Sequence, residues 1–128
     1  MTLHILRLGT PRLTREGTRI GAVRRPPRGV RKENYAKENW YDVWYPELAP
    51  SPKLVSEAQT ARTEKDWTAF VRAFRAEMNA PAPSRALDLL AALSHDAHFS
   101  LGCYCENESH CHRSVLRALL IERGAKIG

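Results

Sequence analysis

Hydrophobic and polar positions alternate near the start of the chain, which is typical of β-strands. Residues 3–8 show this alternation, so we expect a strand that ends at Gly9. A second, shorter strand is predicted over 19–24, and the aromatic run 40–45 favours another strand or an extended segment. The apolar run 99–103 predicts a buried strand.

Apolar positions change to a helical period in the middle of the chain. The clearest helix is predicted over 64–79, where Trp67, Phe70 and Phe74 share one face and Thr63 is the expected N-cap. A shorter helix is expected from Pro52, because proline suits the first turn of a helix.

Two prolines follow the helix predicted over 64–79. Pro81 and Pro83 are expected to interrupt the backbone, so the next helix is predicted to begin at Ser84, with Leu93 among its inward-facing residues. The last helix is predicted over 111–123, because apolar positions recur there at helical spacing and a glycine follows.

The order of these elements predicts an α/β protein. Strands come first, followed by two or three helices, a buried strand and a final helix, which favours a small three-layer sandwich with a mostly parallel sheet flanked by helices. With 128 residues, the chain has the length of one domain, so 1–128 should form a single α/β domain. Ligands bind beyond the carboxyl ends of such strands, which directs attention to the loop after Cys103.

Composition narrows the class of protein. No apolar run approaches the roughly 20 residues that a membrane span requires, and the first seven residues lack the apolar core of a secretory signal. The three cysteines all lie within 103–111 and make a poor disulfide framework. We therefore expect a cytoplasmic protein with no membrane partner; the sequence specifies no oligomeric state.

Positive charge is concentrated at the start of the chain. The net charge is +6, yet residues 1–37 alone hold ten of the 20 basic residues against two acidic ones. Such a cluster suits an anionic partner, either a phosphate-bearing small molecule or a nucleic acid. Pro26, Pro27 and Gly29 lie among the arginines and predict a defined turn, whereas the alternative is a solvated basic loop.

Residues 103–113 contain the most reactive side chains. Because Cys111 opens the last helix, the free N–H groups and the dipole there favour a thiolate or a bound oxyanion. Cys103 or Cys111 is the candidate catalytic thiol, and His112 is the candidate base. The arginines expected to bind the anion are Arg24, Arg28 and Arg113.

Three other interpretations of this loop stay open. Although no cofactor is predicted, zinc is an alternative, and its ligands would be Cys103, Cys105, Cys111 and either His110 or His112. Cys103 and Cys111 could instead form a reversible disulfide. Finally, each cysteine could simply be a small buried hydrophobic residue.

The same loop resembles the family catalogued as domain of unknown function 488 (DUF488). The family pattern is a strand-end cysteine, a short acidic loop and Cys-His-Arg at the start of the last helix, matched here by Cys103 and 111–113. Pro27-Arg28-Gly29 resembles a second block found in one branch. The resemblance extends from about Gly17 to Leu120 and implies an α/β fold, but it implies no particular activity.

Together these observations predict an Arg-rich, Cys/His-lined pocket that binds a phosphate-bearing ligand, a nucleotide or a nucleic acid. If the protein is an enzyme, we expect thiol-dependent transfer or hydrolysis. The alternatives are a small structural zinc protein and a non-enzymatic basic module that binds nucleic acid through stacking aromatic residues. The aromatic residues available for stacking are Tyr35, Trp40, Tyr41, Trp44 and Tyr45.

Overall fold

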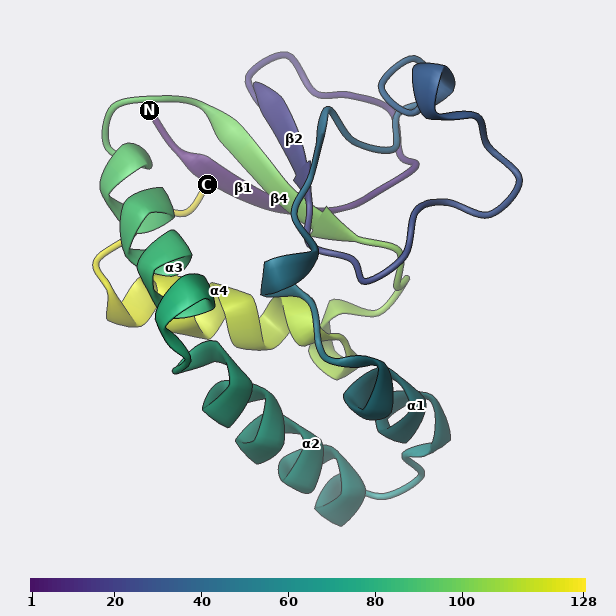
Figure 1. Ribbon diagram of the computed structural model, residues 1–128. Helices are drawn as coiled ribbons and strands as arrows, with labels where there is room; N and C mark the ends of the chain where they lie inside the picture. The colour runs from purple at the N-terminus through teal and green to yellow at the C-terminus, as the bar shows by residue number, and fades with distance from the viewer.

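One four-stranded parallel sheet organises the chain, and the computed structural model describes all of residues 1–128 (Figure 1). The strands are β1 (Leu3–Arg7), β2 (Thr18–Gly21), β3 (Val43–Trp44) and β4 (Phe99–Cys103). Their order in the sheet is β1-β4-β2-β3, and every neighbouring pair is parallel. The α/β class and the parallel sheet predicted from the sequence are therefore confirmed.

Four α-helices accompany the sheet and gather on one side of it (Figure 1). They are α1 (Pro52–Thr60), α2 (Glu64–Met78), α3 (Pro81–Leu93) and α4 (His112–Glu122). Short 3-10 turns lie in the connections at Lys32–Asn34, Pro46–Leu48 and Glu108–His110. None of the helices combines the length and the apolar character needed to cross a membrane.

Local side-chain hydrogen bonds explain where two of the predicted helices begin. Ser51 caps α1, because its side chain accepts a hydrogen bond from the N–H of Leu54. Thr63 caps α2 and forms a capping box with Asp66, in which each side chain accepts from the backbone N–H of the other residue. Both starts agree with the sequence prediction.

The start of α3 corrects the prediction. The helix begins at Pro81 rather than Ser84, so the two prolines open it instead of interrupting the chain. The first N–H groups of a helix have no intrahelical acceptor, and proline loses nothing by lacking that donor there. Leu93, expected to point inward, is 41% exposed at the end of this helix.

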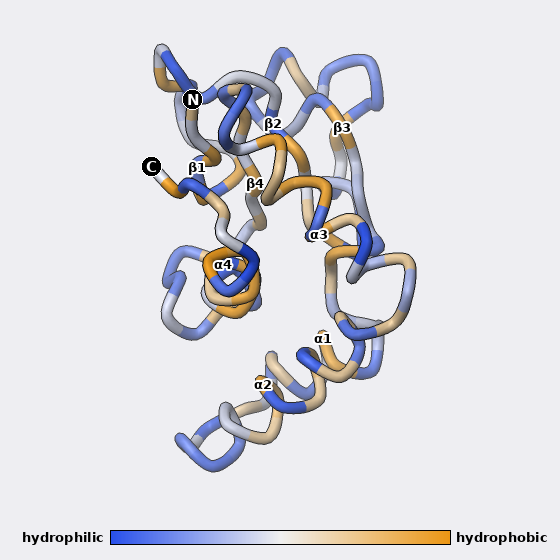
Figure 2. Tube along the Cα trace, turned by 90° about the vertical axis from the view of Figure 1, so that its left-hand side faces the viewer, coloured by the Kyte–Doolittle hydropathy of each residue, from blue (hydrophilic) through white to orange (hydrophobic).

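The two faces of the sheet are covered by different layers. Leu3, Phe99 and Leu101 belong to the main apolar core, together with residues of all four helices. Figure 2 shows hydrophobic positions along the strands and on α4, while α2 alternates between hydrophobic and hydrophilic positions. The opposite face is covered by loops: the Tyr41 ring packs on Gly21, where a Cβ atom would lie only 2.5 Å from the ring.

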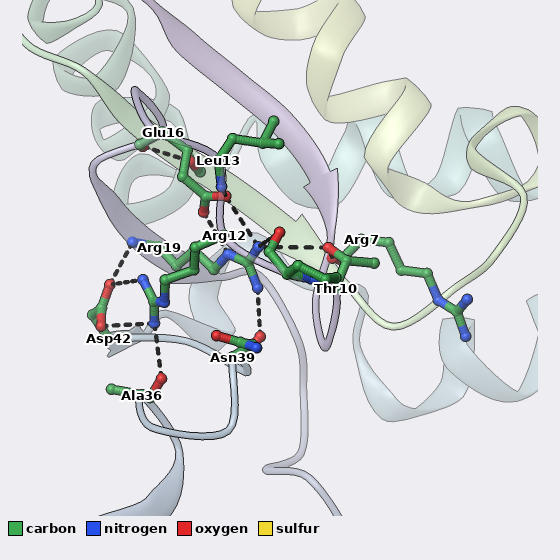
Figure 3. Close-up of polar contacts among 11 residues, drawn as sticks. Arg7, Thr10, Arg12, Leu13, Glu16, Arg19, Ala36, Asn39 and Asp42 are labelled. Atoms are coloured by element: carbon green, nitrogen blue, oxygen red, sulfur yellow. Dashed lines mark hydrogen bonds and ion pairs between the residues drawn. The ribbon is translucent and has the colours of Figure 1, made fainter.

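A buried arginine links this loop layer to the sheet. Arg19 of β2 is only 1% exposed, and its guanidinium donates to the Glu16 carboxylate, with Nε 2.5 Å from Oε2 and Nη2 3.1 Å from Oε1 (Figure 3). The same guanidinium donates to the carbonyl oxygen of Asn39 at 2.5 Å and to that of Pro11 at 3.3 Å. One side chain thus joins β2 to both covering loops.

Asp42 adds a second link between the same segments. It accepts two hydrogen bonds from the Arg12 guanidinium, at 2.9 and 3.0 Å, and one from the backbone N–H of Arg19 at 2.8 Å (Figure 3). These contacts outweigh burial, which by itself raises the pKa of Asp42, so the net pKa lies below its usual value. Asp42 therefore stays ionised in the folded protein.

Removing Arg19 should destabilise the fold strongly. Arg19→Met leaves the buried Glu16 carboxylate without its partner, and we expect the free energy of unfolding to fall by about 3–5 kcal/mol in urea denaturation. Arg75→Met is the matched control, because Arg75 pairs with Glu122 at the surface; its loss should be about 1 kcal/mol or less. Equal losses in the two variants would contradict the importance of the buried pair.

Candidate functional site

A cleft of about 900 Å³ opens at the carboxyl ends of the strands. It is lined by 7–10 at the end of β1, by 23–28 after β2, by 103–105 at the end of β4 and by 110–112 at the start of α4. Residues along α1, from Pro52 to Gln59, complete the wall. Parallel strands direct their carboxyl ends to one edge, which is where the sequence placed the site.

Two buried thiols lie at the floor of this cleft. Cys103 ends β4 and Cys111 is the N-cap of α4, and neither is more than 2% exposed. Their Sγ atoms are 2.6 Å apart. The Cys111 Sγ also accepts a hydrogen bond from the N–H of Arg113 at 3.5 Å. The cysteine therefore satisfies a donor that the helix start leaves free.

His112 is oriented as a base toward Cys111. Its Nε2 lies 2.6 Å from the carbonyl oxygen of Ala22, and because a carbonyl only accepts, Nε2 must carry the proton. Nδ1 is then the free acceptor of the neutral ring, 3.8 Å from the Cys111 Sγ. Burial lowers the pKa of His112, so the imidazole is neutral at pH 7 and can take up a thiol proton.

The third thiol, Cys105, is exposed and lines the same cleft. Hydrogen bonds from Cys103 and then Cys111 lower the pKa of Cys105, and the charges of His112 and Arg113 act in the same direction. The hydrogen bond with Cys105 raises the pKa of Cys103. The hydrogen bond with Cys103 lowers the pKa of Cys111. The hydrogen bond with Cys105 and burial raise it, and the net pKa is about 11. Cys105 is thus the first thiolate to form.

The three arginines predicted to bind the anion lie in three different environments. Arg28 lines the cleft with an exposed side chain that forms no ion pair. Arg24 also lines it, but its guanidinium donates to the carbonyl oxygens of Ala49 and Pro50, each at 3.0 Å. Arg113 is buried beneath the cleft rather than lining it.

Arg113 has an unusual environment for a buried cation. It is 4% exposed, and Nη2 donates to the carbonyl oxygen of Cys105 at 2.6 Å, while Nε has no partner. It forms no ion pair, since Glu108 pairs instead with Arg117 at 2.6 Å. A buried charge needs compensation, and the neighbouring groups able to carry negative charge are the Glu108 carboxylate, which interacts with Arg113 without contacting it, and the thiol cluster.

The cluster also has the composition of a metal site. The ligand atoms of Cys103, Cys111 and His112 all lie within 4.8 Å of one another. Cys105 and His110, the other predicted ligands, are not in this group; the His110 ring lies against Trp67, with Nε2 3.5 Å from the Glu64 carboxylate. Two sulfurs on one tetrahedral zinc are about 3.7 Å apart, so Cys103 and Cys111 would have to separate to hold the ion together.

The aromatic residues proposed for stacking have different positions. Trp40 lines the cleft, beside Gly9, where a Cβ atom would lie 2.8 Å from the indole. Tyr41 is buried against Gly21. Trp44, although 44% exposed, does not line the cleft. Trp40 is therefore the tryptophan available to a ligand in this cleft.

Several lining residues were not predicted as site residues. Arg7 is the last residue of β1 and Thr10 follows it, while Arg25 follows β2 and Tyr104 follows Cys103. Their positions could have indicated them, because each lies at or just beyond the carboxyl end of a predicted strand, where ligands bind in parallel sheets. The carbonyl of Ala22, which orients His112, had no signal, since any residue supplies a carbonyl.

Comparison with known proteins supports the resemblance noted in the sequence. A family model described as the active DUF488-N3 subclade matches residues 3–124, which is almost the whole chain. None of the curated proteins and none of the solved structures compared with the chain matches it.

The lowered pKa of Cys105 predicts early alkylation. At pH 6 an ordinary thiol, with a pKa near about 8.5, is almost entirely protonated and reacts slowly. We expect iodoacetamide to label Cys105 at pH 6 about tenfold faster or more than Cys103 or Cys111, as measured by mass spectrometry after cleavage at Tyr104 and at Glu106 or Glu108. Cys103→Ser should slow this labelling, and a Cys105 rate that rises only above about pH 8 would contradict the assignment.

Proposed function

The chain belongs to the DUF488 family, and we propose that its cleft binds a phosphate-bearing ligand, either a nucleotide or a nucleic acid. One observation carries the proposal: four arginines line the cleft and no carboxylate does. These arginines are Arg7, Arg24, Arg25 and Arg28. A cleft with one sign of charge and partly apolar walls attracts an anion and strengthens its binding.

The arginines at the rim are available to a ligand. Arg25 and Arg28 are exposed and form no ion pair, so an incoming phosphate displaces no carboxylate. Their loop is also restrained: the Tyr104 hydroxyl donates to the carbonyl oxygen of Arg25 at 2.9 Å, and Gly29 has a φ of +75°. A restrained loop loses less conformational entropy on binding than a free one.

The rest of the cleft suits the remaining parts of a nucleotide. The start of α4 lies at the floor, where free N–H groups favour negative charge. Trp40 offers an aromatic surface of the kind on which nucleobases stack. Thr10, Ser56 and Gln59 provide hydrogen-bonding groups along the walls.

We further propose that the protein is a thiol-dependent transferase or hydrolase. His112 Nδ1 takes the proton of Cys111, and the resulting thiolate attacks an electrophilic atom of the bound ligand and displaces a leaving group. The proton on His112 then passes to that leaving group. Transfer to an acceptor, or to water, releases the product and restores the thiol. The description of the subclade as active agrees with a chemical role.

Neutralising the rim arginines tests the binding proposal. In Arg25→Gln/Arg28→Gln, we expect the affinity for nucleoside triphosphates or short single-stranded DNA, measured by isothermal titration calorimetry, to fall about tenfold or more. Lys32→Gln/Lys37→Gln is the matched control, because it removes the same charge from the same basic segment outside the cleft. The control should change affinity by about twofold or less. Equal losses would favour the basic nucleic-acid-binding module instead.

Replacing the nucleophile tests the chemical proposal. Cys111→Ser keeps a good N-cap residue, so we expect the variant to fold and bind nucleotide while losing conversion of the ligand, followed by chromatography of the products. His112→Asn should reduce conversion about 100-fold or more, because it removes the base. Unchanged conversion in Cys111→Ser would refute thiol dependence. About one zinc per purified chain by elemental mass spectrometry would favour a structural zinc protein.

A further inference from the structure

The three cysteines form a site with a second chemical capacity. We propose that a hydroperoxide oxidises this cluster, and that the product is a disulfide between Cys103 and Cys111. The oxidation itself needs no phosphate-bearing ligand. Its consequence rests on the proposed function, because the disulfide consumes the nucleophile Cys111.

The geometry favours this particular pair. Cys103 is fixed by the central strand β4 and Cys111 by its position as N-cap of α4, and their Sγ atoms already lie 2.6 Å apart. A disulfide bond is about 2.05 Å long, so the remaining approach is small and the two elements need not move far. Both side chains are buried, which protects a bond once it has formed.

Cys105 is placed to react with the oxidant first. It is exposed, it lines the cleft, and it lies two residues beyond Cys103 in the chain. The buried guanidinium of Arg113 has no carboxylate partner and contacts the carbonyl oxygen of Cys105 at 2.6 Å. Arg113 thereby fixes the Cys105 backbone at the cleft, where exposure gives a dissolved hydroperoxide access to the Cys105 sulfur, whereas Cys103 and Cys111 are buried.

Three steps connect the first attack to the buried disulfide. The Cys105 thiolate attacks the O–O bond of the hydroperoxide, giving a sulfenic acid and an alkoxide or hydroxide that takes a proton. Cys111 then loses its proton and bonds to the Cys105 sulfur, displacing hydroxide, which leaves as water. Cys103 loses its proton to the medium, attacks the Cys111 sulfur and releases the Cys105 thiolate. Overall, two thiols and one hydroperoxide give one disulfide, one alcohol or water, and one further water.

The experiment uses the full chain, reduced and treated with a chelator, with hydrogen peroxide as the probe. We expect the intact mass to fall by about 2 Da and the number of free thiols to drop from three to one, both reversed by dithiothreitol. Proteolysis after Tyr104 and after Glu106 or Glu108 places the three cysteines on separate peptides, so mass spectrometry identifies the linked pair. A final disulfide that contains Cys105, or three unchanged thiols, would overturn the proposal.

Two variants separate the steps. Cys105→Ser retains the buried pair and should form the same disulfide about tenfold more slowly or worse. Cys111→Ser should instead accumulate a sulfenic acid at Cys105, which dimedone traps. Oxidation of Cys105→Ser at the wild-type rate would refute the role of Cys105.

The same reduced sample, titrated with nucleotide, keeps the two proposals distinct. Normal binding without a disulfide rejects only this inference. A normal disulfide without binding rejects only the proposed function.

Discussion

The buried ion pair between Arg19 and Glu16 is the interaction on which the loop face of the sheet depends. No helix covers this face, so the loops are held largely by polar contacts, and the Arg19 side chain supplies several of them. A guanidinium removed from water is stable only when its donors are satisfied, which forces the carbonyls of Pro11 and Asn39 into place. These positions flank Thr10 and Trp40, so the same pair positions one wall of the cleft.

The opposite wall depends on the close approach of β1 and β4. A Cβ atom at Gly102 would lie 2.8 Å from the carbonyl oxygen of Leu6, so only glycine permits this approach. Beyond it, Cys103 reaches the start of α4 and meets Cys111. Backbone packing therefore helps to bring the sulfur atoms of two cysteines separated by seven residues close together.

Charge and proton are divided within the thiol cluster in a way that serves both proposed reactions. The neighbouring thiols lower the pKa of the exposed Cys105, whereas the pKa of Cys111 is raised to about 11, so in the proposed reaction Cys111 keeps its proton until His112 accepts it. The proposed transfer or hydrolysis would use the Cys111 thiol with His112 as its base. Oxidation would instead begin at Cys105. All three cysteines line the cleft, so the proposed ligand would lie over them and slow oxidation.

The sequence by itself determined the strands, the capped starts of α1 and α2, and the segment that carries the reactive groups, because periodicity and caps are local properties. It also located the basic turn that contains Arg28. Only the tertiary structure decided that His112 joins the thiols while His110 packs on Trp67, and that Arg113 turns inward. These choices depend on contacts between residues distant in the chain, such as His112 with Ala22, which no local pattern encodes.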